Sequence, residues 1–453
     1  MLGSFRNLCA KHHFDQFYVD ESSEVTYREF GARVETVLAQ INEEGIRPGH
    51  VVVIKGEFSF HSIALLTALL INGNVVIPQT AGSMSKLADE LALLHPDFMI
   101  VALAEPVAFE RVGDSTGSCL AGLLPPGDPG MVVFSSGTTG LPKAIVHNAR
   151  RLMDKFATRE NKKVRAIPFL LFDHMGGFNT VLSIMLGGGC IIHCTDRRVD
   201  TICSAVQKFN VSLLPTTPTF LTMMLVSEAW KAYDLSSLRL VTYGTEVMNE
   251  AVLRKLVTVL PNIRFKQTYG LSEVGVLMTS SRGNETTWVK LTGDDLKTRV
   301  DEGILWLQVP SMMLGRVVFE GGDAQFVPHK SDWFCTNDMV DVDGEYFRFR
   351  GRVTDIISVS GLKVYPSEVE NCMLDCPEVA NVVVFGKKNP LVGQVVAAQV
   401  ELMKDISDKP KAKASILARC RDRLERFKVP QDIQFVDAME MSDRLKKMVA
   451  SDA

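Results

Sequence analysis

Short apolar runs alternate with longer, largely apolar segments over most of the chain. Residues 50–54 and 74–78 are rich in valine and isoleucine and predict buried strands, and residues 61–71 between them predict a helix. Similar strand-like runs follow at residues 189–193, 211–214 and 238–242. This strand–helix–strand spacing predicts βαβ units, so the expected fold class is α/β, with parallel-rich sheets covered by helices.

The pattern changes near residues 344–352, where an alternating strand runs into a tight turn. A smaller α+β unit is predicted after this turn, with a helix at 367–375, strands at 379–386 and 394–402, and a lysine-rich helix at 410–426. We therefore predict two domains, residues 1–350 and residues 351–453, with a hinge just after Arg352.

The length of the chain agrees with two domains, and its charge argues against nucleic acid as a partner. The chain has 453 residues, more than one ordinary core accommodates, and its 46% hydrophobic and 23% charged residues are typical of a soluble globular protein. The formal net charge of −4 implies no basic surface, so nucleic acid is not expected as a partner.

No targeting or membrane segment is predicted. The N-terminus lacks the long apolar core of a signal peptide, and the apolar run at residues 63–71 falls short of the roughly 20 residues that span a bilayer. The nine cysteines are scattered without His or Cys partners at metal-ligand spacing. They indicate a reduced compartment, so a cytoplasmic location is expected.

Residues 133–143 read V-F-S-S-G-T-T-G-L-P-K, a strand-like run followed by hydroxyls, glycines and Lys143. Such a loop can bring backbone N–H groups, hydroxyls and one positive charge to a single point, which suits a polyphosphate. The loop is not the common P-loop, because that pattern would need Gly in place of Pro142 and Ser or Thr in place of Ala144.

The order S-S-G-T-T-G-L-P-K resembles the phosphate loop of the adenylate-forming (AMP-binding) enzymes, which include acyl- and aryl-CoA ligases, adenylation domains and luciferases. The resemblance runs from about residue 25 to the C-terminus and implies a large N-terminal domain and a small mobile C-terminal domain. It assigns phosphate contacts to Ser135, Ser136, Gly137, Thr138, Thr139, Gly140 and Lys143, with Thr138 also taking part in catalysis.

Two further segments resemble the nucleotide motifs of this family. Residues 267–273, Q-T-Y-G-L-S-E, are similar to the motif Y-G-x-[TS]-E, and residues 243–246, Y-G-T-E, are similar to a segment that lines the adenine pocket. The resemblance gives Glu273 a magnesium ion, and a hard cation does prefer oxygen ligands. It places the remaining nucleotide contacts at Gly244, Thr245, Glu246, Tyr269, Gly270 and Ser272.

Residues 333–338 are similar to the T-G-D segment of the family, with Asn337 in place of Gly. The resemblance implies that Asp338 accepts hydrogen bonds from both ribose hydroxyls and that Arg352 is a second ribose or phosphate ligand. Asparagine can adopt the left-handed backbone conformation that glycine supplies, so the substitution is expected to be tolerated.

Residues 351–370 resemble the hinge and the loop that enters the active site for thioester formation. The resemblance places Asp355 at the hinge and Gly361 where the backbone approaches a pantetheine chain. Independently, the residues predict a helix start in which Ser367 is the cap and Glu370 occupies the third helical position.

The catalytic lysine of the family follows a P-x-T-x-x-G-K pattern, which the tail of this chain matches only in part. When Ser442 is aligned with the Thr of this pattern, Lys446 falls at the position of the catalytic lysine. Lys447, the next residue, is the alternative candidate.

Residues 170–177, L-L-F-D-H-M-G-G, resemble two branches of the family. His174 followed by two glycines fits the acyl- and aryl-CoA ligases, in which this position helps to gate the acid pocket. Phe172-Asp173 also resembles amino-acid-activating domains, in which the Asp binds the substrate amino group. The CoA ligase interpretation is favoured, and the role of Asp173 stays open.

The resemblance implies ATP-dependent activation of a carboxylic acid to acyl-AMP with release of pyrophosphate, followed by acyl transfer to the thiol of CoA. The expected cofactors are ATP and Mg²⁺, with CoA or phosphopantetheine as acceptor. One alternative is a stand-alone enzyme that loads an acyl, aryl or amino acid onto a separate carrier protein. Another, suggested by the irregular tail, is a non-catalytic nucleotide-binding relative. The sequence does not specify the acid or the oligomeric state.

Overall fold

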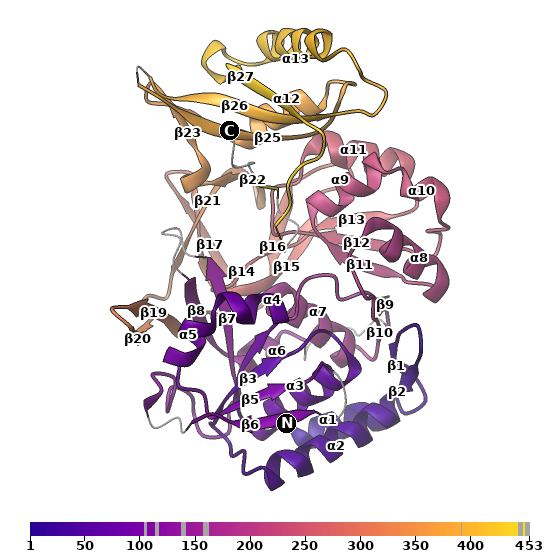
Figure 1. Cartoon of the computed structure of the whole chain (residues 1–453), viewed down its shortest axis with the longest axis vertical. Coiled ribbons are helices and arrows are strands. Elements are labelled where there is room, and N and C mark those ends of the chain that lie inside the picture. The colour runs from indigo at the N-terminus through magenta and orange to yellow at the C-terminus, as the bar shows by residue number, and fades with distance from the viewer. Residues whose placement is uncertain are drawn as a thin grey trace.

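A computed structural model describes residues 1–103, 107–113, 117–136, 142–156, 163–390, 392–442 and 447–448. The strands of these residues form four sheets, and Figure 1 shows the orange and yellow C-terminal unit at one end of the long axis. The indigo helices of the N-terminus lie at the opposite end. None of the helices in the described ranges is long and apolar enough to cross a membrane.

The N-terminal sheet contains the strands that flank the predicted phosphate loop. In spatial order its strands are β20 (Asp323–Pro328), β19 (Gly315–Glu320), β8 (Pro142–Asn148), β7 (Gly130–Ser136), β4 (Val75–Gln79), β3 (Val51–Lys55), β5 (Phe98–Val101) and β6 (Ala108–Arg111). β3 pairs in parallel with β4 and β5, and both faces of β3 and β4 are buried, which explains their continuous apolar sequences.

Two predicted nucleotide segments, residues 243–246 and 267–273, begin at the ends of strands in the central sheet. Its strands are β13 (Arg264–Gln267), β12 (Leu240–Tyr243), β11 (Leu213–Thr216), β9 (Arg165–Ala166), β10 (Cys190–Ile192), β1 (Gln16–Val19) and β2 (Glu24–Thr26). The pairs from β13 to β1 are parallel, and only β2 joins in the antiparallel sense. The central sheet is thus parallel-rich, as predicted. The N-terminal sheet is mixed, because β7, β4, β3 and β5 pair in parallel whereas the outer pairs β20–β19, β19–β8, β8–β7 and β5–β6 are antiparallel.

The helices of the first 260 residues lie between and around these sheets. They are α1 (Leu2–Lys11), α2 (Tyr27–Glu43), α3 (Phe60–Asn72), α4 (Ala81–Lys86), α5 (Ala88–Leu93), α6 (Ala149–Asp154), α7 (Met175–Leu186), α8 (Val199–Phe209), α9 (Pro218–Val226), α10 (Ala229–Ala232) and α11 (Glu250–Val259). α3 is apolar on nearly all sides and buried, as predicted for residues 61–71; Ser59 caps its start and Gly73, with φ of 82°, ends it.

A third sheet is antiparallel throughout, which the apolar runs of the sequence did not predict. Its strands are β14 (Tyr269–Leu271), β15 (Gly275–Ser281), β16 (Val289–Thr292), β22 (Tyr346–Arg352), β21 (Phe334–Asp343), β18 (Ile304–Gln308) and β17 (Lys297–Asp301). It brings the segments around Tyr269, Asp338 and Arg352 into one layer although they are distant in the chain.

The C-terminal unit has the four elements that the sequence predicts, each within a few residues, together with three strands that it did not predict. They are β23 (Ile357–Val359), β24 (Leu362–Val364), α12 (Pro366–Leu374), β25 (Val379–Asn389), β26 (Gly393–Leu402), α13 (Lys409–Arg423) and β27 (Asp432–Val436). α12 packs against β25 and α13, and it also contacts α11 of the large unit. The boundary between residues 350 and 351 stays a prediction.

The predicted cap of α12, Ser367, is wrong by two residues. Tyr365 occupies the cap position and Pro366 is the first helical residue, where its missing N–H has no cost. The Ser367 hydroxyl instead donates to the carbonyl of Arg350 at 2.6 Å, a bond that leads back into β22. Glu370 accepts from the backbone N–H of Val384 at 3.0 Å and is partly buried. A tertiary contact thus replaces the predicted local cap.

Candidate active site

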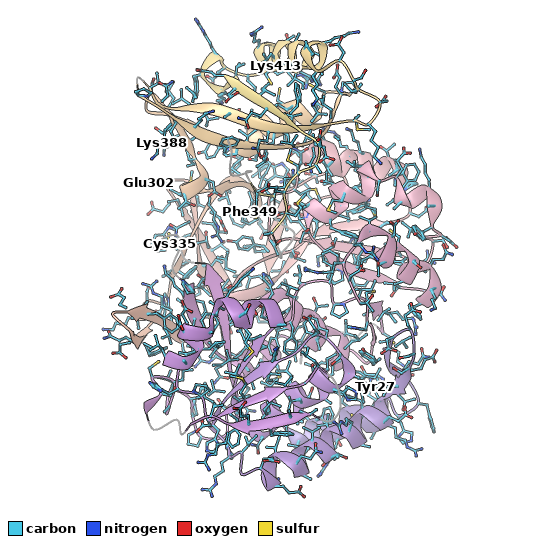
Figure 2. The ribbon with its side chains drawn as sticks, in the orientation of Figure 1. Tyr27, Glu302, Cys335, Phe349, Lys388 and Lys413 are labelled. Carbon is cyan, nitrogen blue, oxygen red and sulfur yellow. The ribbon has the colours of Figure 1, made fainter. Side chains whose placement is uncertain are left out.

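Tyr269, Asp338 and Arg352 come together although they lie in three different strands. The Tyr269 hydroxyl donates to Oδ2 of Asp338 at 2.6 Å, and Nε of Arg352 lies 3.5 Å from Oδ1. Asp338 and Arg352 are directly opposite in the register of β21 and β22. The Tyr269 ring stacks on Phe349 with centroids 4.3 Å apart; Figure 2 labels Phe349 near the middle of the molecule. We call these four residues the nucleotide cluster.

Burial dominates the electrostatics of this cluster. Asp338 is only 8% exposed, and burial raises the pKa of its carboxyl group above the ordinary value. The Tyr269 hydroxyl and the Arg352 guanidinium lower that pKa, whereas Asp355 and Glu273 raise it. Burial also raises the pKa of Tyr269, so its hydroxyl is a donor at neutral pH. The influence of Glu273 places this carboxylate near the cluster.

Asn337 adopts the backbone conformation that the sequence predicts for it. Its φ is 58°, in the left-handed region that glycine occupies in the family motif. Thr336 fixes the neighbouring residue, because its hydroxyl donates to the Leu305 carbonyl at 2.7 Å and accepts from the Asp338 N–H at 3.0 Å. The Thr336 hydroxyl therefore ties the Asp338 N–H to the backbone of β18.

The turn that carries Ser272 and Glu273 is held through its backbone. The carbonyl of Ser272 is 2.6 Å from Nε2 of His147, and the carbonyl of Glu273 accepts from the N–H of Met313 at 2.8 Å. The hydroxyl of Ser311 donates to the next carbonyl, that of Val274, at 2.7 Å. We call residues 271–276 the Glu273 turn.

The phosphate-loop segment begins and ends in an antiparallel hairpin of β7 and β8. Ser135 pairs with Lys143 and Ser136 with Pro142, so Ser135 and Lys143 lie opposite each other at the base of the loop. The predicted contact residues Gly137, Thr138, Thr139 and Gly140 lie outside the described residues. Their roles stay predictions.

The predicted adenine segment follows β12 and packs closely on the end of β13. A Cβ atom at Gly244 would lie 2.6 Å from Oγ1 of Thr268, so a larger residue would force the two strand ends apart. Thr245 has a φ of 71°. Glu246 accepts from the hydroxyl of Thr219 at 2.7 Å, at the N-terminus of α9, where a negative charge is favoured.

His174 has a structural contact that the sequence did not predict. It is the cap residue of α7, and its Nδ1 accepts from the N–H of Gly176 at 3.0 Å. The double glycine has a packing reason, because a Cβ atom at Gly177 would lie 2.2 Å from the Leu171 carbonyl oxygen. The predicted gating role of His174 stays untested.

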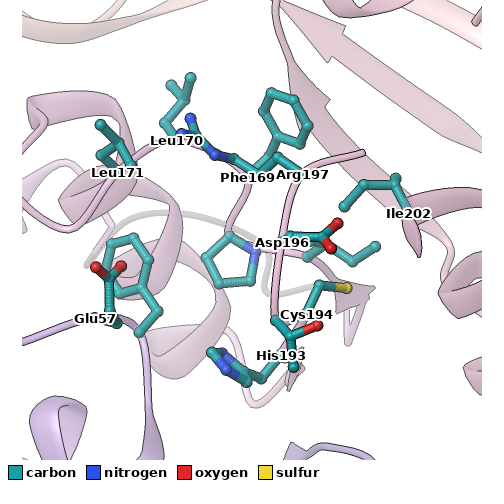
Figure 3. Close-up of a pocket in the computed structure, with 13 residues that line it drawn as sticks. Glu57, Phe169, Leu170, Leu171, His193, Cys194, Asp196, Arg197 and Ile202 are labelled. Carbon is teal, nitrogen blue, oxygen red and sulfur yellow. The ribbon is translucent and has the colours of Figure 1, made fainter. Parts of the chain in front are cut away.

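Asp173 is buried, with 4% exposure, and its Oδ1 has no hydrogen-bond partner. Glu57, a residue that sequence reasoning missed, lies near it: burial and then the Asp173 charge raise the pKa of the Glu57 carboxyl group, and Arg197 lowers it. Glu57 also lines a cavity of about 90 Å³. Figure 3 shows Glu57 on one side of this cavity and His193, Cys194 and Asp196 on the other.

Two buried oxygens at the carboxyl ends of the central sheet were also missed. Thr216, Tyr243 and Gln267 are the last residues of β11, β12 and β13, and they are in register and buried. Oγ1 of Thr216 and Oε1 of Gln267 have no hydrogen-bond partner. Ligands of open α/β sheets bind at the carboxyl ends of the strands. The position of Thr216 and Gln267 at the ends of strands could therefore have indicated these residues from the sequence.

The structure describes the predicted hinge residues Asp355 and Gly361, but only one of the two candidate lysines in the tail. Asp355 ends a short 3₁₀ turn (Val353–Asp355) directly after β22 and is exposed. Gly361 lies in the turn between β23 and β24 with φ of 83°, and a Cβ there would meet nothing within 4 Å. Lys446 lies outside the described residues. The rival Lys447 donates from Nζ to the Val382 carbonyl at 3.0 Å, inside the C-terminal unit.

Residues 5–300 match the family described as AMP-binding enzyme, and residues 368–446 match the AMP-binding enzyme C-terminal domain. The chain belongs to this family. The resemblance drawn from the motifs is thereby confirmed.

Among curated relatives, an indoleacetate–CoA ligase from Aromatoleum aromaticum is 25% identical over 395 residues, covering 80% of this chain and 75% of the relative. A fatty acid–[acyl-carrier-protein] ligase, ScoC, from Streptomyces coeruleorubidus is 25% identical over 472 residues, covering 92% and 89%. The relatives support the expected enzyme class, an AMP-forming ligase.

Solved structures share the fold over nearly the whole chain. The anthranilate CoA ligase AuaEII in complex with anthranoyl-AMP has a TM-score of 0.79 at 17% identity, covering 98% of this chain and 95% of that one. The o-succinylbenzoate CoA synthetase MenE from Bacillus subtilis, in complex with the acyl-adenylate OSB-AMP, has a TM-score of 0.75 at 16% identity, covering 98% and 96%. These similarities confirm the expected fold class.

Proposed function

We propose that the enzyme uses MgATP to convert a carboxylic acid to its acyl-AMP and then transfers the acyl group to the thiol of CoA. The nucleotide cluster carries this proposal, because Tyr269, Asp338 and Arg352 meet at positions that match the nucleotide motifs of the family. Membership of the AMP-binding family and the CoA ligases among the relatives support it.

In the first step, a carboxylate oxygen attacks the α-phosphorus of ATP, an O–P bond forms, and pyrophosphate leaves as its bond to that phosphorus breaks. Asp338 would accept hydrogen bonds from the ribose hydroxyls and Arg352 would bind ribose or phosphate. Ser135 and Lys143, opposite each other at the hairpin base, would direct a hydroxyl and a positive charge at the phosphates. In the second step, the thiol sulfur bonds to the acyl carbon, AMP leaves and the thiol proton is released.

Glu273 is the residue proposed to hold Mg²⁺. Among the residues that the structure describes, no group of three or more His, Cys, Asp or Glu side chains could hold a metal ion. A lone carboxylate nevertheless fits this ion, because Mg²⁺ on nucleotides is commonly held by one or two carboxylates together with phosphate oxygens and water. When bound, Mg²⁺ would offset the negative charge of the phosphates.

A second candidate is an enzyme that loads an amino acid or another acid onto a carrier-protein phosphopantetheine. The buried, unpaired Oδ1 of Asp173 favours an acid that bears an amino group, because an ammonium ion would satisfy this oxygen. The carrier-protein ligase ScoC, which matches 92% of this chain, makes a carrier a reasonable acceptor.

Two measurements test these proposals. Pyrophosphate exchange into ATP, run with fatty, aryl, dicarboxylic and amino acids, identifies the activated acid. Thioester formation with that acid is then compared between CoA and a holo-carrier protein. Exchange with an acid followed by transfer to CoA is the expected result. Transfer to the carrier alone would favour the second candidate, and absence of exchange with every acid would contradict both.

A further inference from the structure

His147 is a buried histidine in β8, the strand that leaves the phosphate loop, and none of the sequence motifs involves it. Its side chain is 0% exposed. Burial lowers the pKa of its imidazole to about 4, although the carbonyls of Ser272 and Ser311 favour the protonated form. The ring is therefore neutral at physiological pH.

The contact with Ser272 determines which nitrogen carries the proton. Nε2 lies 2.6 Å from the Ser272 carbonyl oxygen, and a carbonyl oxygen can only accept. In the neutral ring, Nε2 must therefore be the N–H donor and Nδ1 the bare nitrogen. Nδ1 is buried and has no hydrogen-bond partner. The short bond to Ser272 is thus the hydrogen bond of a fully enclosed side chain, and the Ser311 carbonyl is the other polar group that acts on the ring.

This bond reaches the peptide plane that leads directly into Glu273. Three successive carbonyls of the Glu273 turn accept from donors elsewhere in the chain: Ser272 from His147, Glu273 from Met313, and Val274 from Ser311. Met313 and Ser311 both precede β19, whereas His147 belongs to the hairpin of β7 and β8. Within this group of bonds, the one from His147 joins the Glu273 turn to the hairpin that carries the phosphate loop.

We propose that His147 is a positioning residue that fixes the Glu273 turn relative to the phosphate-loop hairpin. The inference rests on the proposed function, in which the two segments bind the Mg²⁺ and the phosphates of one nucleotide. Glu273 would hold Mg²⁺ and the hairpin would bind the phosphates, so a shift between the two segments would weaken binding of MgATP. His147 touches neither ligand, so its effect passes through the Ser272 peptide.

The alternative is that His147 merely fills space in the core. Substitution by leucine keeps an apolar side chain there but leaves the Ser272 carbonyl without its donor. Substitution by glutamine keeps an amide N–H that can reach the carbonyl. His193 provides a matched control, because it is also largely buried with a pKa lowered by burial, but it lines the cavity beside Glu57.

The experiment compares His147→Leu, His147→Gln and His193→Leu in the full chain. Binding of ATP is measured by calorimetry with and without Mg²⁺, together with the KM for MgATP in pyrophosphate exchange. We expect His147→Leu to weaken MgATP binding by about tenfold or more, with little change for ATP in the absence of Mg²⁺. His147→Gln should recover most of this loss, and His193→Leu should bind MgATP as the wild type does.

Two results would overturn the inference. One is unchanged MgATP binding by a folded His147→Leu variant. The other is an equal loss in His147→Leu and His147→Gln, because that would assign the effect to shape and not to the N–H donor. The binding measurement needs no turnover. Failure of the proposed function would appear separately, as absence of exchange by the wild-type enzyme with every acid.

Discussion

The Asp338 carboxylate has two polar partners in the site, but burial still destabilises its ionised form. Its carboxylate faces the Tyr269 hydroxyl and the Arg352 guanidinium, yet burial still leaves its pKa above the ordinary value. The ionised form is therefore less stable in the folded protein than in the unfolded chain. This is the pattern expected where a charge is kept for function at the expense of stability.

Replacement of Asp338 by Asn should stabilise the fold and weaken nucleotide binding. Because the folded pKa is raised, the wild type is most stable, relative to the variant, below the pKa of the unfolded carboxyl group. It loses that advantage as pH rises through the folded pKa. Denaturation of both proteins at several pH values should therefore give a stability gain for Asp338→Asn at neutral pH that shrinks in acid. Binding of AMP should weaken by about 1.5–3 kcal/mol, the usual effect of losing hydrogen bonds to a charge.

An unchanged affinity for AMP in Asp338→Asn would remove Asp338 from the ribose site. A stability gain that did not depend on pH would mean that burial of the charge is not its cause.

Glu273→Gln should lower pyrophosphate exchange on the order of a hundred-fold, as removal of a contact that offsets developing charge typically does. A neutral amide holds Mg²⁺ poorly, so part of the loss should be recovered at high Mg²⁺ concentration. Exchange rates of the variant and the wild type across a Mg²⁺ titration check this. Full activity of Glu273→Gln at low Mg²⁺ would exclude Glu273 as the metal ligand.

The residues that motifs predicted belong to short local segments, whereas the residues that motifs missed depend on contacts between distant parts of the chain. Tyr269, Asp338 and Arg352 stand in short segments whose local order is itself recognisable, so the sequence indicated them before the sheet that joins them was known. His147 and Glu57 act through contacts with residues more than a hundred positions away. No local pattern contains that information, and the helix start at Ser367 failed for the same reason.

At the scale of elements, the contacts of Lys447 in the C-terminal sheet favour Lys446 as the proposed catalytic lysine. Burial raises the pKa of the Glu370 carboxyl group in α12, and the positive charge of Lys447 lowers it. Lys447 also donates to the Val382 carbonyl of β25 at 3.0 Å. Lys447 is therefore committed to its own unit, and Lys446 remains the proposed catalytic lysine.

The two lysines should respond differently to substitution. Lys447→Met removes the positive charge that lowers the pKa of Glu370 and leaves the Val382 carbonyl without its donor. The C-terminal unit should therefore be destabilised by about 1–3 kcal/mol, and both half-reactions should suffer. Lys446→Ala should keep the unfolding midpoint and lose adenylation, while thioester formation from a supplied acyl-AMP persists. Denaturation curves and both half-reactions measured on each variant make the comparison. A selective loss of adenylation in Lys447→Met, with Lys446→Ala unaffected, would reverse the assignment.

At the scale of the whole molecule, the contact between α11 and α12 holds the C-terminal unit in one orientation. The N–H of Glu250 donates to Asn371 at 3.0 Å, and Arg254 pairs with Asp375 at 3.3 Å. Apolar residues of the two helices also belong to one buried cluster. In this orientation the turn at Gly361 has open space around it. For Gly361 to line the path of a thiol, the unit must rotate and these contacts must separate.

Rotation about Asp355 should therefore be required for acyl transfer but not for adenylation. Asp355 ends a 3₁₀ turn, and proline fixes φ near −65°, a value that this turn accepts. Asp355→Pro should hold the present orientation of the C-terminal unit, so pyrophosphate exchange should persist. Acyl transfer to CoA should slow by about tenfold or more, which corresponds to an activation barrier raised by about 1.4 kcal/mol. The decisive quantity is the ratio of the two half-reaction rates in each variant.

Gly361→Leu tests the same rotation from the other end. At a φ of 83° any side chain is strained, so Gly361→Ala serves as the control for strain without bulk. If Gly361 lines the thiol path after rotation, leucine should slow acyl transfer well beyond alanine, and both variants should keep exchange because the turn faces open space in the present orientation. Equal loss of both half-reactions in Asp355→Pro and Gly361→Leu would mean that this region supports folding alone. The acyl-transfer step would then lack support from the arrangement of the two units.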